Sequence, residues 1–186
     1  MDFKEHSDLA GRHAFLSPSY YHWINYNDQK LEARLVSWRA AMRGVSLHEF
    51  AHMAVKLGQK LPKSRKTLHM YVNDGIAYKM EVEVPLFYSA NCFGHADSVA
   101  FNGRLLRIHD LKTGIGRTSV HQLEIYAALF CLEYSYSPFD IEIELRIYQS
   151  DEIQVYHPDP DQIRNIMDTI IEFDLKIEYM RERGLV

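Results

Sequence analysis

Apolar and charged residues alternate along several short stretches of the chain, which is the pattern of β-strands with one buried face. Between Met80 and Val84, every second residue is apolar and the two residues between them are glutamates. Five strands are expected, over residues 80–84, 92–101, 104–111, 141–147 and 152–156. Asn102 and Gly103 favour the positive φ angles of a tight turn, so we predict that they join the second and third strands as a two-residue hairpin loop.

Other stretches repeat apolar residues at helical spacing. Helices are expected within 17–61, over about 119–134 and over about 160–183. In the first region, Ser17 resembles a helix N-cap before Pro18. A separate helix is expected to open at Gly44 and to end near Gly58. The order of helices, three strands, helix, two strands and helix predicts an α/β fold in which helices flank a mixed β-sheet.

Length and composition indicate one folded domain that spans residues 1–186. Apolar residues make up 47% of the chain, which is enough for a core, and charged residues make up 25%, which argues against disorder. Within the domain we expect an N-terminal helical part over 1–61, a core that carries the chemistry over about 44–134, and C-terminal strands with a helix over 140–186.

The chain shows neither a membrane segment nor a disulfide pattern. No apolar run approaches the roughly 20 residues that span a bilayer, and the polar N-terminus lacks a signal-peptide pattern. Cys92 and Cys131 each stand alone among apolar residues, so we expect two reduced thiols. These features predict a cytoplasmic protein without membrane contact, in the host cytoplasm if the source is viral.

Basic residues are concentrated in two parts of a chain whose net charge is -4. Five of them lie between Lys56 and Lys66, a segment without any acidic residue. We expect Lys63, Arg65 and Lys66 in a loop, together with Arg117, to contact the phosphates of a nucleic acid. Such contacts give binding that is largely independent of base sequence and sensitive to salt.

The strongest candidate chemistry lies on the second and third predicted strands. Asp97 precedes the Asn102 turn, while Asp110 and Lys112 follow it at similar distance, so all three should reach the same end of the hairpin. Residues two apart on a strand share a face, which places Asp110 beside Lys112. Neighbouring carboxylates repel one another unless a cation lies between them, and hard oxygen ligands favour Mg²⁺ or Mn²⁺. A lysine beside such an ion is typical of phosphodiester hydrolysis.

Four motifs in order then resemble the RecB-type branch of the PD-(D/E)XK nuclease superfamily. They are G-x-x-x-H ending at His48, G-x-x-D ending at Asp97, D-x-K ending at Lys112 and Q-x-x-x-Y ending at Tyr126. The resemblance covers about residues 44–134 well, and it implies a restriction-endonuclease-like core.

The resemblance also implies a role for each matched residue. The metal would be held by His48, Asp97, Asp110 and the carbonyl of Leu111, and Lys112 would be the catalytic lysine. Gln122 and Tyr126, one helical turn apart, would face the site and help to place DNA or Lys112. Some relatives bind an iron–sulfur cluster through four cysteines, and because this chain has only two, we predict no such cluster.

By the same resemblance, the expected activity is hydrolysis of DNA phosphodiester bonds with Mg²⁺ or Mn²⁺. The favoured type is a phage-type exonuclease in viral or bacterial DNA recombination or repair. DNA would be the main partner, a homo-oligomer would be compatible with this type, and a single-strand annealing or other recombination protein would be a second partner.

A competing motif lies on the first helical region. The letters H-E-F-A-H from His48 to His52 fit H-E-x-x-H, the zinc-binding helix of metallopeptidases, with Glu49 as general base. A peptidase needs a third ligand, for which His69, Glu81 and Glu83 are the candidates. This interpretation leaves the strand carboxylates and Lys112 unexplained, whereas the nuclease interpretation treats His52 as structural or as an outer neighbour of the metal. A catalytically inactive DNA-binding relative is the third alternative.

Overall fold

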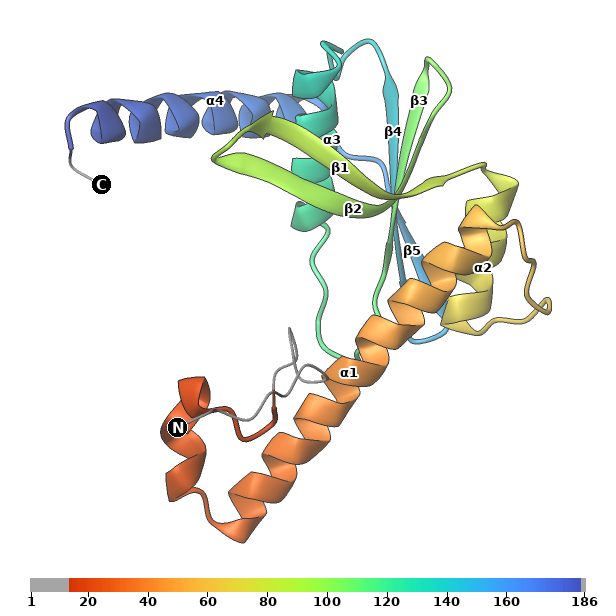
Figure 1. The fold of residues 1–186 in the computed structure, drawn as a ribbon. Coiled ribbons are helices and arrows are strands. Elements are labelled where there is room, and N and C mark those ends of the chain that lie inside the picture. Colours follow the sequence, from red (N-terminus) through yellow and green to blue (C-terminus); the bar gives the residue numbers. More distant parts are fainter. Residues whose placement is uncertain (1–13, 185–186) are drawn as a thin grey trace, which may run out of the picture. The chain divides into compact units, whose positions relative to one another are not determined.

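The computed structural model of the chain describes residues 14–184 (Figure 1). The chain divides into two compact units, one up to Ser46 and one from Leu47 onward. The first contains a short 3-10 helix, η2 (Pro18–Asn25), and most of α1 (Asp28–Lys56), whose last turns belong to the second unit. Among the described residues, no helix is both long enough and apolar enough to cross a membrane.

Two predictions about the first helical region need correction. Ser17 has the extended backbone expected before Pro18, but its side chain makes no capping hydrogen bond. Gly44 does not open a helix, because α1 runs through it without a break. A single glycine costs a helix about 1 kcal/mol, which does not end it. The actual start of α1 is marked by Asn27, whose side-chain oxygen accepts a hydrogen bond from the Lys30 amide at 2.9 Å.

The second unit is built on one five-stranded sheet, with the strands in chain order. They are β1 (Glu81–Ser89), β2 (Cys92–Phe101), β3 (Leu105–Leu111), β4 (Glu142–Gln149) and β5 (Glu152–Tyr156). All neighbours are antiparallel except β3 and β4, which are parallel and are connected through α3 (His121–Glu133). The expected α/β class with a mixed sheet is therefore confirmed.

The hairpin between β2 and β3 is wider than predicted. Strand β2 ends at Phe101 and β3 begins at Leu105, so three residues form the loop instead of two. Asn102 shapes this loop, because its side-chain oxygen accepts hydrogen bonds from the amides of Arg104 and Leu105 at 3.1 and 2.8 Å. Gly103 has the positive φ of 88° that the sequence led us to expect at this position.

One helix of the second unit was not predicted. Helix α2 (Thr67–Ala77) follows the basic loop and buries Tyr71, Val72 and Gly75. Its glycine and β-branched residues weaken the local helical signal. Packing explains the glycine, because a Cβ on Gly75 would lie 2.8 Å from a methyl of Val55. The helix is thus stabilised by a close contact that only the folded chain contains.

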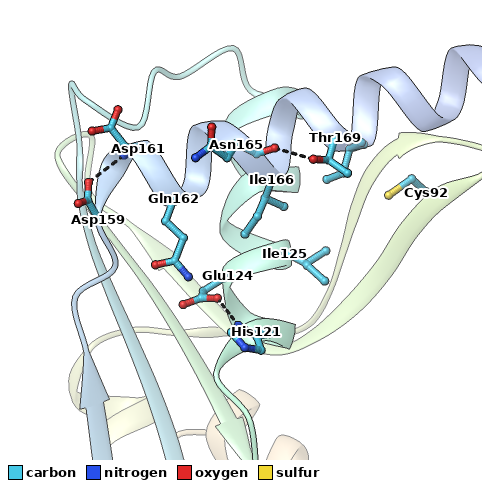
Figure 2. A pocket seen from close by; sticks show the side chains of 11 residues that line it. Cys92, His121, Glu124, Ile125, Asp159, Asp161, Gln162, Asn165, Ile166 and Thr169 are labelled. Carbon is cyan, nitrogen blue, oxygen red and sulfur yellow. Dashed lines mark hydrogen bonds and ion pairs between the residues drawn. The ribbon is translucent and has the colours of Figure 1, made fainter.

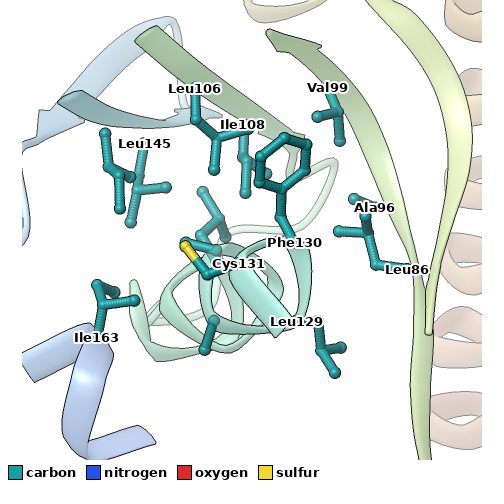
Figure 3. Close-up of a cluster of buried hydrophobic side chains, with 14 of the residues drawn as sticks. Leu86, Ala96, Val99, Leu106, Ile108, Leu129, Phe130, Cys131, Leu145 and Ile163 are labelled. Carbon is teal, nitrogen blue, oxygen red and sulfur yellow. The ribbon is translucent and has the colours of Figure 1, made fainter. Parts of the chain in front are cut away.

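Apolar side chains form two cores. The larger core joins β1–β4, α3 and the start of α4 (Pro160–Glu182), with Leu106, Ile108 and Phe130 near its centre (Figure 3). The smaller core contains the last turns of α1 and residues of α2, together with Leu111 and Tyr148. Because β3 contributes to both cores, the C-terminal end of this strand, which carries the candidate chemistry, is held rigidly.

Candidate active site

Three carboxylates stand in one row across the first three strands. Ser98 pairs with His109, which puts Asp97 and Asp110 at the next opposed positions of β2 and β3. On the other side of β2, the pairs flanking Glu83 place it opposite Asp97. Asp97 is tied to the neighbouring strand, because its Oδ2 accepts a hydrogen bond from the Leu111 amide at 2.8 Å. The structure therefore brings Asp97 and Asp110 together, as the strand pattern predicted.

Lys112 lies directly against this pair. Its Nζ donates a hydrogen bond to Oδ1 of Asp110 at 2.9 Å and another to Oε1 of Gln122 at 3.1 Å. Its amide continues the pairing of β3 with β4, donating to the Tyr148 carbonyl at 2.9 Å. The ammonium group is therefore fixed between a strand carboxylate and the first turn of α3.

Asp110 is 5% exposed, and its second oxygen, Oδ2, is buried without a hydrogen-bond partner. Burial raises the pKa of this carboxyl, the hydrogen bond from Lys112 lowers it, and the charge of Asp97 raises it again, with a net upward shift. A buried carboxylate oxygen without a donor is costly, and a bound cation would compensate that cost. This unpartnered oxygen is the observation that fits a metal centre best.

His48 approaches the carboxylates from the last part of α1. Its Nδ1 lies 3.6 Å from Oδ2 of Asp97. Potential ligand atoms of His48, His52 and Asp97 all lie within 4.8 Å of one another, close enough for one ion. Asp110 does not belong to this compact trio. For Leu111 the structure shows an amide bound to Asp97, and the metal-binding role of its carbonyl stays a prediction.

The first two turns of α3 complete the site. Gln122 donates to the Tyr126 hydroxyl at 3.4 Å, and that hydroxyl donates to the His95 carbonyl at 2.7 Å. The Tyr126 ring covers Gly94, where a Cβ would lie 2.9 Å from the ring. The first residue of the G-x-x-D motif therefore makes room for the last residue of the Q-x-x-x-Y motif.

A groove of about 430 Å³ extends from Lys112 and Gln122 along the loop that precedes α3, and Arg117 lines it. Gln149, at the end of β4, shapes this loop. It is buried, and its amide nitrogen donates to the carbonyls of Gly114 and Gly116 at 2.6 and 2.9 Å. This role was not predicted, because the contact joins residues far apart in the chain.

The basic loop before α2 is exposed at Lys63, Arg65 and Lys66. No contact joins these side chains to Asp97, Asp110 or Lys112 among the interactions of residues 14–184. The loop nevertheless ends at Thr67, which lines a smaller hollow of about 210 Å³ together with Lys112. The amide of Thr67 donates to the Asp151 carboxylate at 2.8 Å, which fixes the start of α2 to the β4–β5 turn.

The peptidase motif is only partly supported. His48 and His52 do approach one another on α1, but the third member of their cluster within residues 14–184 is Asp97. None of the expected third ligands belongs to the cluster, and His69 instead lies 2.9 Å from the Ser64 hydroxyl through its Nδ1.

Glu83, one of the residues expected as a third ligand of a peptidase site, lies beside His52. Its Oε1 lies 3.2 Å from Nδ1 of His52, without hydrogen-bonding geometry. It has a φ of 53°, which is rare for a residue other than glycine. Its side chain is 67% exposed, as the alternation along β1 predicts.

A larger hollow of about 830 Å³ lies between α3 and α4 (Figure 2). Its lining is mainly apolar, with a buried Glu124 that contacts Nδ1 of His121 at 2.7 Å. None of the predicted site residues lines it. Size alone therefore does not identify the candidate active site, which rests on the carboxylates, Lys112 and the imidazoles.

Comparisons of the chain with protein-family models, with curated proteins and with solved structures gave no significant match.

Proposed function

We propose that the protein is a metal-dependent deoxyribonuclease with a restriction-endonuclease-like core. The observation that carries this proposal is the buried, unpartnered Oδ2 of Asp110, opposite Asp97 and next to a fixed lysine ammonium. The four motifs of the RecB-type nuclease branch support it, since contacts link residues from each of them, namely His48, Asp97, Asp110, Lys112, Gln122 and Tyr126. Structural salt bridges alone would leave the unpartnered oxygen without a purpose.

The donor set fits Mg²⁺ or Mn²⁺. Asp97 and Asp110 offer carboxylate oxygens and His48 offers an imidazole nitrogen, with the Leu111 carbonyl as a further ligand by resemblance. When bound, such an ion would polarise the scissile phosphate and lower the pKa of a bound water. Lys112 would orient that water or stabilise negative charge on the phosphate, because Asp110 and Gln122 hold its ammonium group in place.

DNA would be bound through its phosphates. The groove beside Lys112 carries Arg117, and the exposed loop with Lys63, Arg65 and Lys66 ends at Thr67, which lines a second hollow beside the same lysine. Both features are locally basic, although the net charge of the chain is -4. Binding is therefore expected to be largely independent of base sequence.

The resemblance supports an exonuclease role in viral or bacterial recombination or repair, and partners such as a second copy of the chain or a single-strand annealing protein. A cytoplasmic location follows from the polar N-terminus and the two lone cysteines, and the absence of an iron–sulfur cluster follows from the cysteine count.

The test is to incubate end-labelled linear DNA and circular DNA with the protein and each divalent metal. We expect degradation with Mg²⁺ or Mn²⁺ and none in chelator, and loss of linear DNA alone would identify an exonuclease. Hydrolysis that chelator does not affect would contradict the metal mechanism. DNA that shifts in a gel but is never shortened would identify a binding-only protein, and cleavage of peptides with zinc would favour the peptidase.

A further inference from the structure

We propose that His52 is a direct ligand of the ion held by His48 and Asp97, so that the centre selects Mn²⁺ or another first-row transition metal over Mg²⁺. The inference rests on the proposed function for the use of this ion in DNA cleavage. The coordination itself follows from side chains whose positions do not depend on that activity, and it can be measured without DNA.

The first observation is the distance between donors. His48 and His52 lie four residues apart on α1, which puts both imidazoles on one side of the helix. Together with Asp97 they offer three ligand atoms within 4.8 Å of one another. Since Asp97 lies on β2, helix and sheet both contribute to the cluster, and the last turns of α1 are packed in the smaller core.

The second observation is independent of the first. His52 is 8% exposed, and both its ring nitrogens are buried without a hydrogen-bond partner. Buried imidazole nitrogens are normally paired, so two unpaired ones on the same ring call for an explanation. A metal ion on one nitrogen and a carboxylate near the other would satisfy the whole ring.

Glu83 provides that carboxylate, 3.2 Å from Nδ1 of His52. Histidines that bind metals usually donate their other ring proton to a carboxylate or a carbonyl, which fixes the tautomer. A proton on Nδ1, shared with Glu83, would leave the lone pair on Nε2 for the ion.

Two imidazoles change the choice of metal. Mg²⁺ prefers oxygen ligands and keeps much of its water, whereas imidazole suits Mn²⁺ and later first-row ions better. A site in which two imidazoles join the carboxylate ligands is therefore expected to bind a transition metal ion more tightly than Mg²⁺.

The experiment counts imidazole ligands on Mn²⁺ bound to the wild-type protein, by the nitrogen couplings in its pulsed electron paramagnetic resonance spectrum. We expect two coordinated imidazoles in the wild type and one in His52→Gln, which keeps a buried polar side chain. His157→Gln is the matched control, because this histidine lies between β5 and α4 and contacts the Ile143 carbonyl. The His157→Gln variant should keep two imidazoles coordinated to Mn²⁺. One imidazole or none on Mn²⁺ in the wild-type protein would overturn the inference without relying on any variant.

Calorimetric titration provides the second measurement. His52→Gln should weaken Mn²⁺ binding at least about tenfold while leaving the weaker Mg²⁺ binding unchanged, and Glu83→Gln should weaken Mn²⁺ binding about tenfold. Equal losses for both metals would contradict the proposed selectivity. Two imidazoles on Mn²⁺ without any DNA cleavage would contradict the nuclease and leave this site intact. Cleavage of DNA by a protein with a single coordinated imidazole would contradict the proposed role of His52 and leave the nuclease proposal intact.

Discussion

Asp110 shows at the scale of one residue how the site is prepared for a cation. One of its oxygens is hydrogen-bonded to Lys112, and the other is buried with no donor. In the metal-free protein, burial raises the pKa of this carboxyl, so its charge destabilises the folded chain. A carboxylate that destabilises the folded chain without an ion, and is stabilised when an ion binds, is typical of metal sites.

The first prediction concerns the stability of the Asp110→Asn variant in chelator. Because the folded chain has the higher pKa, wild-type stability falls as the pH rises from the ordinary carboxyl value of 3.8 through that pKa. The variant cannot ionise there, so its free energy of unfolding should exceed that of the wild type by on the order of 1 kcal/mol at neutral pH, with a smaller gain in acid. Thermal unfolding at several pH values measures this, and a gain that does not depend on pH would contradict the account.

The second prediction concerns the lysine. Lys112→Ala should lower the rate of DNA cleavage by at least about 100-fold, because the group that orients the water or offsets the phosphate charge is lost. DNA binding should persist, as measured by fluorescence anisotropy in Ca²⁺. Lys176→Ala, an exposed lysine of α4, is the control and should cleave normally. Retained cleavage by the Lys112 variant would remove this residue from the mechanism.

The sequence predicted the centre of the site but not its surroundings. The two-residue period of strands and a hairpin were enough to bring Asp97, Asp110 and Lys112 together. The contact of Glu83 with His52 and the contact of Gln149 with Gly114 could not be predicted in this way. Each joins residues more than thirty positions apart in the chain.

At the scale of elements, β2 and α3 depend on each other through Gly94 and Tyr126. The tyrosine ring lies where a Cβ at position 94 would be, and its hydroxyl binds the His95 carbonyl. The same hydroxyl accepts a hydrogen bond from Gln122, which in turn holds Lys112. A change at the glycine should therefore reach the lysine through α3.

The third prediction follows from this contact. Gly94→Ala should destabilise the protein by about 1–3 kcal/mol, because the ring must move away from the new methyl group. It should also reduce cleavage, since Tyr126 and Gln122 lose their positions. Chemical denaturation measures the stability. In the Tyr126→Ala background the same glycine change should cost little, and an undiminished cost there would show that the ring is not the cause.

Strands were predicted better than helices because their signals are local. Four of the five strands occur close to their expected ranges, while β1 continues five residues beyond the expected range of 80–84. The helices after β3 and β5 also agree. Helix α2 was missed because its glycine is required by a contact with Val55 that the sequence cannot reveal. The β2–β3 loop was predicted too short, since Asn102 uses its side chain to bridge two further amides.

At the scale of the molecule, charge is distributed unevenly along the chain. The net charge is -4, yet the segment from Lys56 to Lys66 carries five basic residues and no acidic one. Its loop residues are exposed, and Arg117 lines the groove beside Lys112. A negatively charged protein can therefore still bind a polyanion, provided that these positions make the contacts.

The fourth prediction tests that distribution. The double variant Lys63→Ala with Arg65→Ala should weaken DNA binding at low salt and reduce the slope of log affinity against log salt concentration by about two. The effect should be similar for different base sequences. Binding measured by anisotropy over a range of salt concentrations gives the slope, with Lys176→Ala as control. An unchanged slope would place the phosphate contacts elsewhere.

The α/β class and the mixed sheet could be predicted because the order of elements restricts the topology strongly. The type of nuclease could not be derived in the same way, because polarity, strand preference and attack at ends depend on how DNA enters the site.

The central claim is that one ion is bound by carboxylates of neighbouring strands beside the Lys112 ammonium. A crystal structure of the protein with Mn²⁺, measured at a wavelength where manganese scatters anomalously, tests it most directly. The account predicts an anomalous peak bonded to both Asp97 and Asp110. A peak elsewhere, or one bonded to the imidazoles but not to Asp110, would contradict it.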